Sequence, residues 1–301
     1  MNPSIMNSHK VSVIMPAYNA QDFIKQSILS VINQTYTNIE LVIVNDGSTD
    51  NTADVIMDCE KMYPDKILFV NKSINEGTAK TINIAMEYAS GEYLSWLSAD
   101  DLYSEKMVES SVDFLLKHPE FDACYSLSAV IDEKNNILGF EKRSEEYINT
   151  MLSGDSTPLY KRMIEISNFF HGCSVLGKRT NFLEVGGFDP AFRYAHDYDF
   201  WLRFAAITNI GFINEYNVYG RTYPTQISRQ GHNEKDAVLV WSNFKDNKQL
   251  YEKLMKKAGH KDYIESVHLG FINRISYYHH NKEELLTVLN EYKKFIETLS
   301  I

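Results

Sequence analysis

The sequence predicts an α/β fold in which a Rossmann-like, mostly parallel sheet is flanked by helices. Three observations support this prediction. Short runs of apolar, often β-branched residues recur through the first hundred residues, segments with apolar residues at helical spacing separate them, and a polar string follows each run. Strands that alternate with helices in this way are typical of a doubly wound sheet.

The first βαβ unit is expected within residues 11–44. Val11 to Met15 is a strand-like run that stops at Pro16, and Glu40 to Val44 repeats the pattern. Between them, Ala20 to Asn33 carries apolar residues at helical spacing, which predicts an amphipathic crossover helix. The two strands are therefore expected to be parallel.

The same alternation continues to residue 97. The next expected elements are a helix over Thr52 to Met62, a strand over Ile67 to Val70, a helix over Thr78 to Tyr88 and a strand over Tyr93 to Leu97. Ligands of such sheets bind beyond the carboxyl ends of the strands. The polar strings that fall there are residues 17–19, 46–50, 71–77 and 98–101.

Beyond residue 101 the alternation loosens. A helix is expected over Ser104 to Lys117 and a strand from Ala123 to Ile131, followed by a mobile polar loop or lid from Asp132 to Asp155. A turn at residues 186–190, a helix from about Asp197 to Ile207 and helices in the tail after Asn233 complete the prediction. The polar loop is expected to order over a bound ligand, because it lacks apolar periodicity and lies next to the polar strings.

Composition excludes several classes of partner. The chain has 301 residues, a net charge of -10 at pH 7 and no basic cluster, which argues against a nucleic-acid ligand. Its three cysteines are an odd number at wide spacing and fit neither a disulfide framework nor a zinc site. No stretch reaches the apolar length of a signal peptide or a membrane span. A reduced, cytoplasmic protein is expected, with any membrane contact peripheral.

Asp100 and Asp101 directly follow the apolar strand that ends at Leu97. Paired carboxylates with hydroxyl neighbours suit a hard divalent cation that holds a substrate diphosphate. The alternative is an Asp that caps the following helix. A second polar loop, Asp46 to Thr52, combines a glycine with side chains able to bind a base and a ribose, although turn formation and helix capping also explain it.

A third carboxylate cluster opens the helix that begins near residue 197. Asp199 and Arg203 are four apart and can form an intrahelical pair. Asp197 has no such helical partner, and a carboxylate held at a helix start suits a general base. His171 and Cys173 lie two residues apart, where a metal role is conceivable, but a buried neutral histidine and an inert core cysteine are the favoured interpretation.

Taken in order, four strings resemble the family 2 glycosyltransferases of the GT-A fold, over about Val11 to Ser228. They are residues 11–19 (VSVIMPAYN), 44–50 (VNDGSTD), 98–101 (SADD), and 186–189 (GGFD) followed by 197–203 (DYDFWLR). Each string alone is a weak signal, whereas the ordered set is specific.

The resemblance implies an inverting transferase that uses a nucleoside-diphosphate sugar, most often a UDP-sugar. The residues that it implies for the nucleotide are Pro16, Ala17, Asn19, Asp46, Asp100 and Arg221. Asp101 would ligate Mn²⁺ or Mg²⁺ on the diphosphate, and Asp197 would deprotonate the acceptor hydroxyl. The sugars of donor and acceptor would contact His196, Asp199 and Tyr223.

The sequence departs from the family pattern at three positions. Tyr223 stands where relatives often carry a histidine that contacts metal or phosphate, which makes Arg221 the better phosphate partner. Ser98 stands where many relatives carry an aspartate, and His196 where an acidic residue often precedes the base. Altered metal affinity is therefore expected.

The resemblance also divides the chain. Residues 1–230 would form the GT-A domain, with a nucleotide-binding half over about 10–101 and an acceptor half over about 102–230, and residues 231–301 a helical extension. The acceptor would be a glycan or a lipid-linked glycan, in the synthesis of surface polysaccharide or a glycoconjugate. Peripheral association with the inner face of the membrane fits such an acceptor.

Three alternatives compete with this interpretation. A sugar nucleotidyltransferase would carry a glycine-rich, cationic loop after the first strand, where this chain has Pro16 to Ala20. An oxidoreductase would carry a Gly-x-Gly-x-x-Gly string there. A catalytically silent protein that binds a nucleotide-sugar or a glycan fits the three departures and would hold a donor without consuming it.

Overall fold

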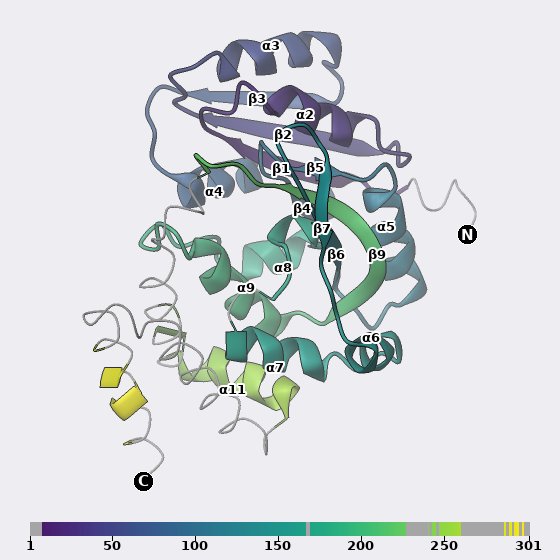
Figure 1. Cartoon of the computed structure of the whole chain (residues 1–301), viewed down its shortest axis with the longest axis vertical. Helices are drawn as coiled ribbons and strands as arrows, with labels where there is room; N and C mark the ends of the chain where they lie inside the picture. The colour runs from purple at the N-terminus through teal and green to yellow at the C-terminus, as the bar shows by residue number, and fades with distance from the viewer. Residues whose placement is uncertain are drawn as a thin grey trace.

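The computed structural model describes residues 8–166, 169–226, 240, 243–244 and 247–259, together with 286, 289–290, 292–294 and 297. Its centre is a nine-stranded sheet whose strand order is β3-β2-β1-β4-β8-β6-β9-β5, with β7 paired to β6 off this path. The parallel N-terminal strands lie at one end of the molecule, and the long strand β9 curves from them toward α7 and α11 at the other end (Figure 1).

The N-terminal half is the predicted alternation of strands and helices. Its elements are β1 (Val11–Ala17), α2 (Ile24–Ile32), β2 (Ile39–Asp46), α3 (Thr52–Met62), β3 (Ile67–Lys72), α4 (Thr78–Tyr88) and β4 (Tyr93–Trp96). Strand β1 pairs in parallel with both β2 and β4, and β2 pairs in parallel with β3. The carboxyl ends of these strands therefore meet at one edge of the sheet.

The second half adds mostly antiparallel pairs to this sheet. Its elements are β5 (Leu102–Tyr103), α5 (Met107–Lys117), β6 (Ala123–Ile131), β7 (Ile137–Phe140), α6 (Glu145–Leu152), α7 (Thr157–Ile166), the 3-10 helix η1 (Gly172–Ser174), β8 (Leu176–Lys178), α8 (Arg179–Glu184), α9 (His196–Ile207), β9 (Ile210–Arg221) and α11 (Lys248–Ala258). Strand β8 runs antiparallel to β4 and β6, whereas β6 and β9 are parallel. Parallel pairing thus dominates only the N-terminal half.

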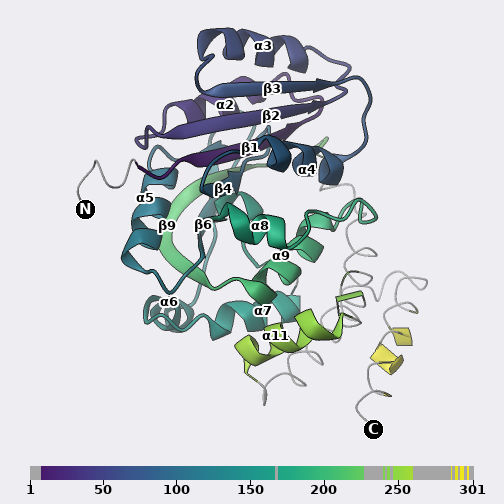
Figure 2. The same cartoon turned by 180° about the vertical axis from the view of Figure 1, so that it is seen from behind.

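Alternating side chains of the strands build a hydrophobic core on each face of the sheet. In β1, Ile14 joins the core that contains α4 and α9, whereas Val13 and Met15 join the core that contains α2 and α5. Both faces of the strand are apolar because helices cover both, as expected for a parallel sheet. Seen from behind, α4, α8 and α9 lie together over one of these faces (Figure 2).

The segment from Asp132 to Asp155, predicted as a mobile polar loop or lid, contains regular structure, so the prediction of a loop without helix or strand is wrong; its ordering over a bound ligand stays a prediction. This segment forms β7, which pairs antiparallel with β6, and α6, whose N-cap Ser144 accepts a hydrogen bond from the Tyr147 N–H. Strand β7 is largely exposed and α6 has only eight residues. Helix α6 does place the buried Tyr147 and Met151 four residues apart, but over so few residues this spacing is a weak signal for a helix.

Most of the predicted C-terminal extension lies outside the described residues. The described helix α11 buries Leu254, Met255 and Ala258 in the core that α9 shares. Lys257 donates hydrogen bonds to the carbonyls of Ala205 and Thr208 at the end of α9. This part of the predicted extension therefore packs against α9 and shares its core. Within the described chain, every helix is too short or too polar to cross a membrane.

Candidate functional site

A cleft of about 480 Å³ lies beyond the carboxyl ends of β1, β2 and β4. Every residue predicted for the site lines it except Asp199: Pro16, Ala17, Asn19, Asp46, Asp100, Asp101, His196, Asp197, Arg221 and Tyr223. Segments from residue 16 to residue 226 converge on this space. Its position is the one at which open α/β sheets bind their ligands.

The carboxylates of Asp100 and Asp101 follow β4 in a tight turn, in which the Asp101 N–H donates to the Ser98 carbonyl at 3.2 Å. Asp101 is buried, and its Oδ1 accepts a hydrogen bond of 2.8 Å from the Arg221 N–H. Burial raises the pKa of both carboxyl groups to about 6, and the charge of Asp101 adds to the rise for Asp100. These two adjacent acids, of which Asp101 is buried and Asp100 half-buried, lack a full counter-charge, which a cation would supply.

Asp101, His171 and Cys173 bring a carboxylate oxygen, an imidazole nitrogen and a sulfur together, within 4.8 Å of one another. The Oδ2 of Asp101 lies 3.6 Å from Nε2 of His171 and 3.6 Å from Sγ of Cys173. Burial lowers the pKa of His171, which favours its neutral form, and raises that of Cys173 well above its usual range. The donor set fits a divalent metal ion.

Arg221, the predicted phosphate partner, lies at the end of β9 and is 3% exposed. Its guanidinium donates to the carbonyl of Asp100 at 2.7 Å, to the carbonyl of Asp132 at 2.8 Å and to Oδ1 of Asn135 at 2.7 Å. It also lies over the ring of Phe23, 4.7 Å from the centroid. The side chain therefore forms a wall of the cleft and joins three chain segments.

Asp46 is the last residue of β2 and precedes the loop that follows this strand. Its Oδ1 accepts from the Lys72 ammonium and the Glu76 N–H, and its Oδ2 accepts from the Gly77 N–H. Burial acts to raise the pKa of Asp46, but these donors hold it below its usual range. Asn19, with a φ of 47°, accepts at Oδ1 from the Thr49 N–H at 2.9 Å. Asn19 thus joins the loop after β1 to the loop after β2, and Asp46 joins the end of β2 to residues 72–77.

Asp197 lies in the first turn of α9, whose N-cap residue Ala195 offers no side-chain hydrogen bond. Its Oδ1 accepts from the N–H of Tyr198 at 2.8 Å. The next turn buries Phe200 and Trp201 in the core. Core packing thus holds the start of the helix, and the half-buried carboxylate faces the cleft.

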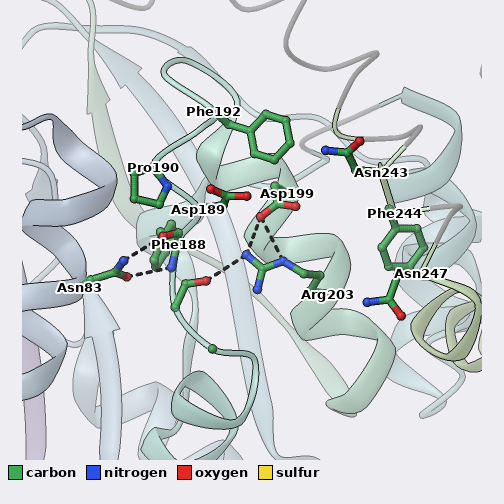
Figure 3. A pocket seen from close by; sticks show the side chains of 12 residues that line it. Asn83, Phe188, Asp189, Pro190, Phe192, Asp199, Arg203, Asn243, Phe244 and Asn247 are labelled. Atoms are coloured by element: carbon green, nitrogen blue, oxygen red, sulfur yellow. Dashed lines mark hydrogen bonds and ion pairs between the residues drawn. The ribbon is translucent and has the colours of Figure 1, made fainter.

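Asp199 is the predicted site residue that the structure does not bring into the cleft. It lines a second pocket of about 480 Å³ behind the Gly186–Phe192 loop, where its Oδ2 binds the Nε of Arg203 at 3.0 Å. Figure 3 shows the pair pointing toward each other, with Asn243 and Asn247 across the pocket. Arg203 also donates to the Val185 and Gly187 carbonyls. The intrahelical pair noted in the sequence is therefore what forms.

Several residues that line the cleft escaped the sequence-based prediction. Aromatic and cationic examples are Trp96, Phe170, Arg193 and Tyr194, beside His171 and Cys173. Trp96 stacks on Phe188 with centroids 5.2 Å apart, so it belongs to the core as well as to the cleft. The sequence could have indicated Arg193 and Tyr194 as cleft residues, because they lie between the Gly186–Asp189 turn and Asp197, the predicted base.

Comparison with known proteins identifies relatives. The sequence matches the model of the family "Glycosyl transferase family 2" over residues 12–183. An uncharacterized glycosyltransferase of Rickettsia typhi is 32% identical over 263 residues, which are 87% of this chain and 79% of that protein.

Two solved structures share the fold. S. aureus TarS, residues 1–349 in complex with UDP-GlcNAc, superposes with a TM-score of 0.70 at 18% identity, over 96% of this chain and 81% of that one. The mannosyltransferase PcManGT of Pyrobaculum calidifontis, in complex with GDP-Man and Mn²⁺, has a TM-score of 0.59 at 19% identity, over 94% and 74%. The predicted GT-A fold class is confirmed.

Proposed function

Because the chain belongs to glycosyltransferase family 2, we propose that it is an inverting, metal-dependent transferase. It moves a sugar from a nucleoside-diphosphate sugar to a hydroxyl group of a glycan acceptor. The observation that carries this proposal is that one cleft holds both the adjacent Asp100 and Asp101 carboxylates and the Asp197 carboxylate at the start of α9.

The donor site is assigned to the loops after β1, β2 and β4. Asp46 is oriented by Lys72, Glu76 and Gly77, and a carboxylate oxygen there can accept an N–H of a uracil or a guanine. A UDP-sugar is the proposed donor. TarS bound to UDP-GlcNAc supports this choice, and PcManGT bound to GDP-Man makes GDP the comparison to test.

The diphosphate is assigned to the region of Asp100, Asp101 and Arg221. Mn²⁺ or Mg²⁺ held by Asp101 would offset the charge that develops on the leaving diphosphate. Asp100 would bind the ribose. Arg221 would act through its positive charge in the wall of the cleft, since its own N–H groups already bind protein acceptors. Pro16, Ala17 and Asn19 would line the nucleotide pocket.

Asp197 is assigned the role of general base. Its carboxylate takes the proton of the acceptor hydroxyl as that oxygen bonds to the anomeric carbon. The bond from this carbon to the diphosphate oxygen breaks on the opposite face, and the nucleoside diphosphate leaves with the electron pair. The configuration inverts in this single step, and no covalent intermediate with the enzyme forms.

The acceptor half of the cleft is assigned to the side chains around α9 and η1. His196 and Tyr223 are the proposed contacts for donor and acceptor sugars, and Trp96 and Tyr194 add aromatic surface. A glycan or lipid-linked glycan used in surface polysaccharide synthesis is the proposed acceptor. A cytoplasmic protein with peripheral contact to the inner membrane face would meet such an acceptor.

The test begins with thermal unfolding of the full chain against UDP, GDP and their sugar derivatives, with and without Mn²⁺ or Mg²⁺. A ligand that binds the native state raises the unfolding midpoint. We expect a metal-dependent rise with UDP ligands that Asp101→Ala abolishes and the surface variant Asp113→Ala retains. No rise with any nucleotide would contradict the proposal. Binding without release of nucleoside diphosphate, in the presence of acceptor glycans, would identify a silent binding protein instead.

A further inference from the structure

We propose that His171 and Cys173 are ligands of the metal ion that Asp101 holds, which makes the site a mixed oxygen, nitrogen and sulfur site. Such a site prefers a softer first-row cation, such as Co²⁺ or Zn²⁺, over Mg²⁺. The inference rests on the proposed function, because it starts from a metal ion at Asp101. It assigns a chemical role to two residues for which the sequence favoured a structural one.

The ligand atoms lie at the separations that a shared ion requires. With bonds of roughly 2.1 Å to oxygen and nitrogen and 2.3 Å to sulfur, tetrahedral angles put oxygen about 3.4 Å from nitrogen and about 3.6 Å from sulfur. In the structure, Asp101 Oδ2 lies 3.6 Å from His171 Nε2 and 3.6 Å from Cys173 Sγ. One ligand atom from each of the three side chains lies within 4.8 Å of the other two.

The backbone around the cluster leaves room for this arrangement. A Cβ at Gly220 would lie 2.9 Å from Nε2 of His171, so the glycine makes space for the imidazole beside Asp101. The thiol of Cys173 is buried and its Sγ lies 3.4 Å from the hydroxyl of Ser98.

The chemistry of the ligands decides the choice of ion. Carboxylate oxygen suits Mg²⁺ and Mn²⁺, imidazole suits Zn²⁺ and other late first-row ions, and thiolate binds softer ions most strongly. The sulfur binds as a thiolate, so the thiol proton passes to solvent when the ion enters. The positive charge of the ion compensates the thiolate and the Asp101 carboxylate together. The remaining coordination positions are open to oxygens of a diphosphate.

The test measures binding of Co²⁺ to the full chain in the presence of UDP. A thiolate ligand produces a sulfur-to-cobalt charge-transfer band in the near ultraviolet, which oxygen and nitrogen ligands do not. We expect this band in the wild type and in the control Cys124→Ser, whose sulfur is buried elsewhere, and its loss in Cys173→Ser. Cys173→Ser should lower the affinity for Co²⁺ and Zn²⁺ by at least about tenfold and should change the affinity for Mg²⁺ little.

A second pair of variants tests the histidine without deleting a ligand. Gly220→Ala should displace the His171 ring and weaken Co²⁺ binding, whereas Gly139→Ala adds a methyl group in open space and should not. Circular dichroism confirms that each variant is folded. Cobalt absorption that depends on Asp101 but shows no charge-transfer band overturns the inference and leaves the proposed function intact. Absence of bound Co²⁺ while Mn²⁺ and UDP still raise the unfolding midpoint overturns the inference alone, and absence of both signals overturns the proposed function as well.

Discussion

Tyr223 donates its phenolic hydroxyl to Oδ2 of Asp100 at a distance of 3.0 Å. This contact joins the segment after β9 to the turn after β4, and the ring of Tyr223 packs on Phe23 with centroids 5.1 Å apart. Tyr223 therefore orients a half-buried carboxylate of the cleft.

Substitution Tyr223→Phe should weaken donor binding and leave the fold intact. The variant keeps the ring contact with Phe23 but leaves the half-buried Asp100 carboxylate without this hydrogen bond, a cost of about 1–3 kcal/mol. Because Asp100 is the proposed ribose contact, we expect UDP affinity to fall by roughly tenfold. Calorimetric titration with UDP and Mn²⁺ measures the change. The control is Tyr216→Phe, which removes an exposed hydroxyl that donates to the Glu141 carbonyl. Equal affinities for the two variants would contradict the role of Tyr223.

Substitution Asp197→Asn should abolish transfer but keep donor binding. The amide retains the shape of the carboxylate and an oxygen that can accept from the Tyr198 N–H, but it cannot take a proton from the acceptor. Loss of a general base lowers the turnover number by about 100- to 10,000-fold. Release of nucleoside diphosphate in the presence of acceptor measures turnover, and the UDP-induced rise of the unfolding midpoint reports binding. Normal turnover in a variant that binds donor would rule out this base.

Substitution Asp199→Asn should lower the stability of the protein and leave transfer unchanged, in contrast to Asp197→Asn. Asp199 is buried and pairs with Arg203 in the second pocket, away from the cleft (Figure 3). Breaking a buried ion pair from one side costs about 3–5 kcal/mol, because the other charge stays buried. We expect a clearly lower unfolding midpoint and unchanged turnover at a temperature where the variant is native. A loss of turnover without a loss of stability would restore the predicted sugar contact.

The sequence was informative where local pattern and topology agree. Strand β1 spans Val11–Ala17 and β2 spans Ile39–Asp46, close to the predicted runs, because both faces of these strands are buried and apolar. Parallel strands bring their carboxyl ends to one edge. The convergence of Asp46, Asp100 and Asp101 therefore follows from the order of elements alone.

What the sequence missed depends on contacts between distant segments. Arg221 donates to Asp132 and Asn135, which lie about 90 residues earlier, and the sequence does not show that these acceptors would occupy its guanidinium. The approach of His171 to Asp101 likewise arises from the pairing of β4 with β8, which places η1 beside the turn after β4. For α6 a local signal was present, since Ser144 and two acidic residues mark a helix start.

The last prediction concerns Lys257 and the docking of α11. Burial lowers the pKa of Lys257 to about 8 from an ordinary value of 10.5, while its ammonium donates to the Ala205 and Thr208 carbonyls. Between pH 8 and pH 10.5 the unfolded chain therefore binds more protons than the native chain. Stability rises with pH wherever the unfolded state binds more protons.

In this window the free energy of unfolding of the wild type should increase relative to that of Lys257→Met, which has no titrating group at this position. Below pH 8 the difference between the two proteins should be constant, because Lys257 is then charged in both the native and the unfolded wild type. Urea denaturation of both proteins below and above pH 8 measures their free energies of unfolding. Subtracting the value of Lys257→Met from that of the wild type cancels the contributions of the other groups that titrate in this range. A difference that stays constant through pH 10.5 would show that Lys257 titrates normally and that α11 does not bury it.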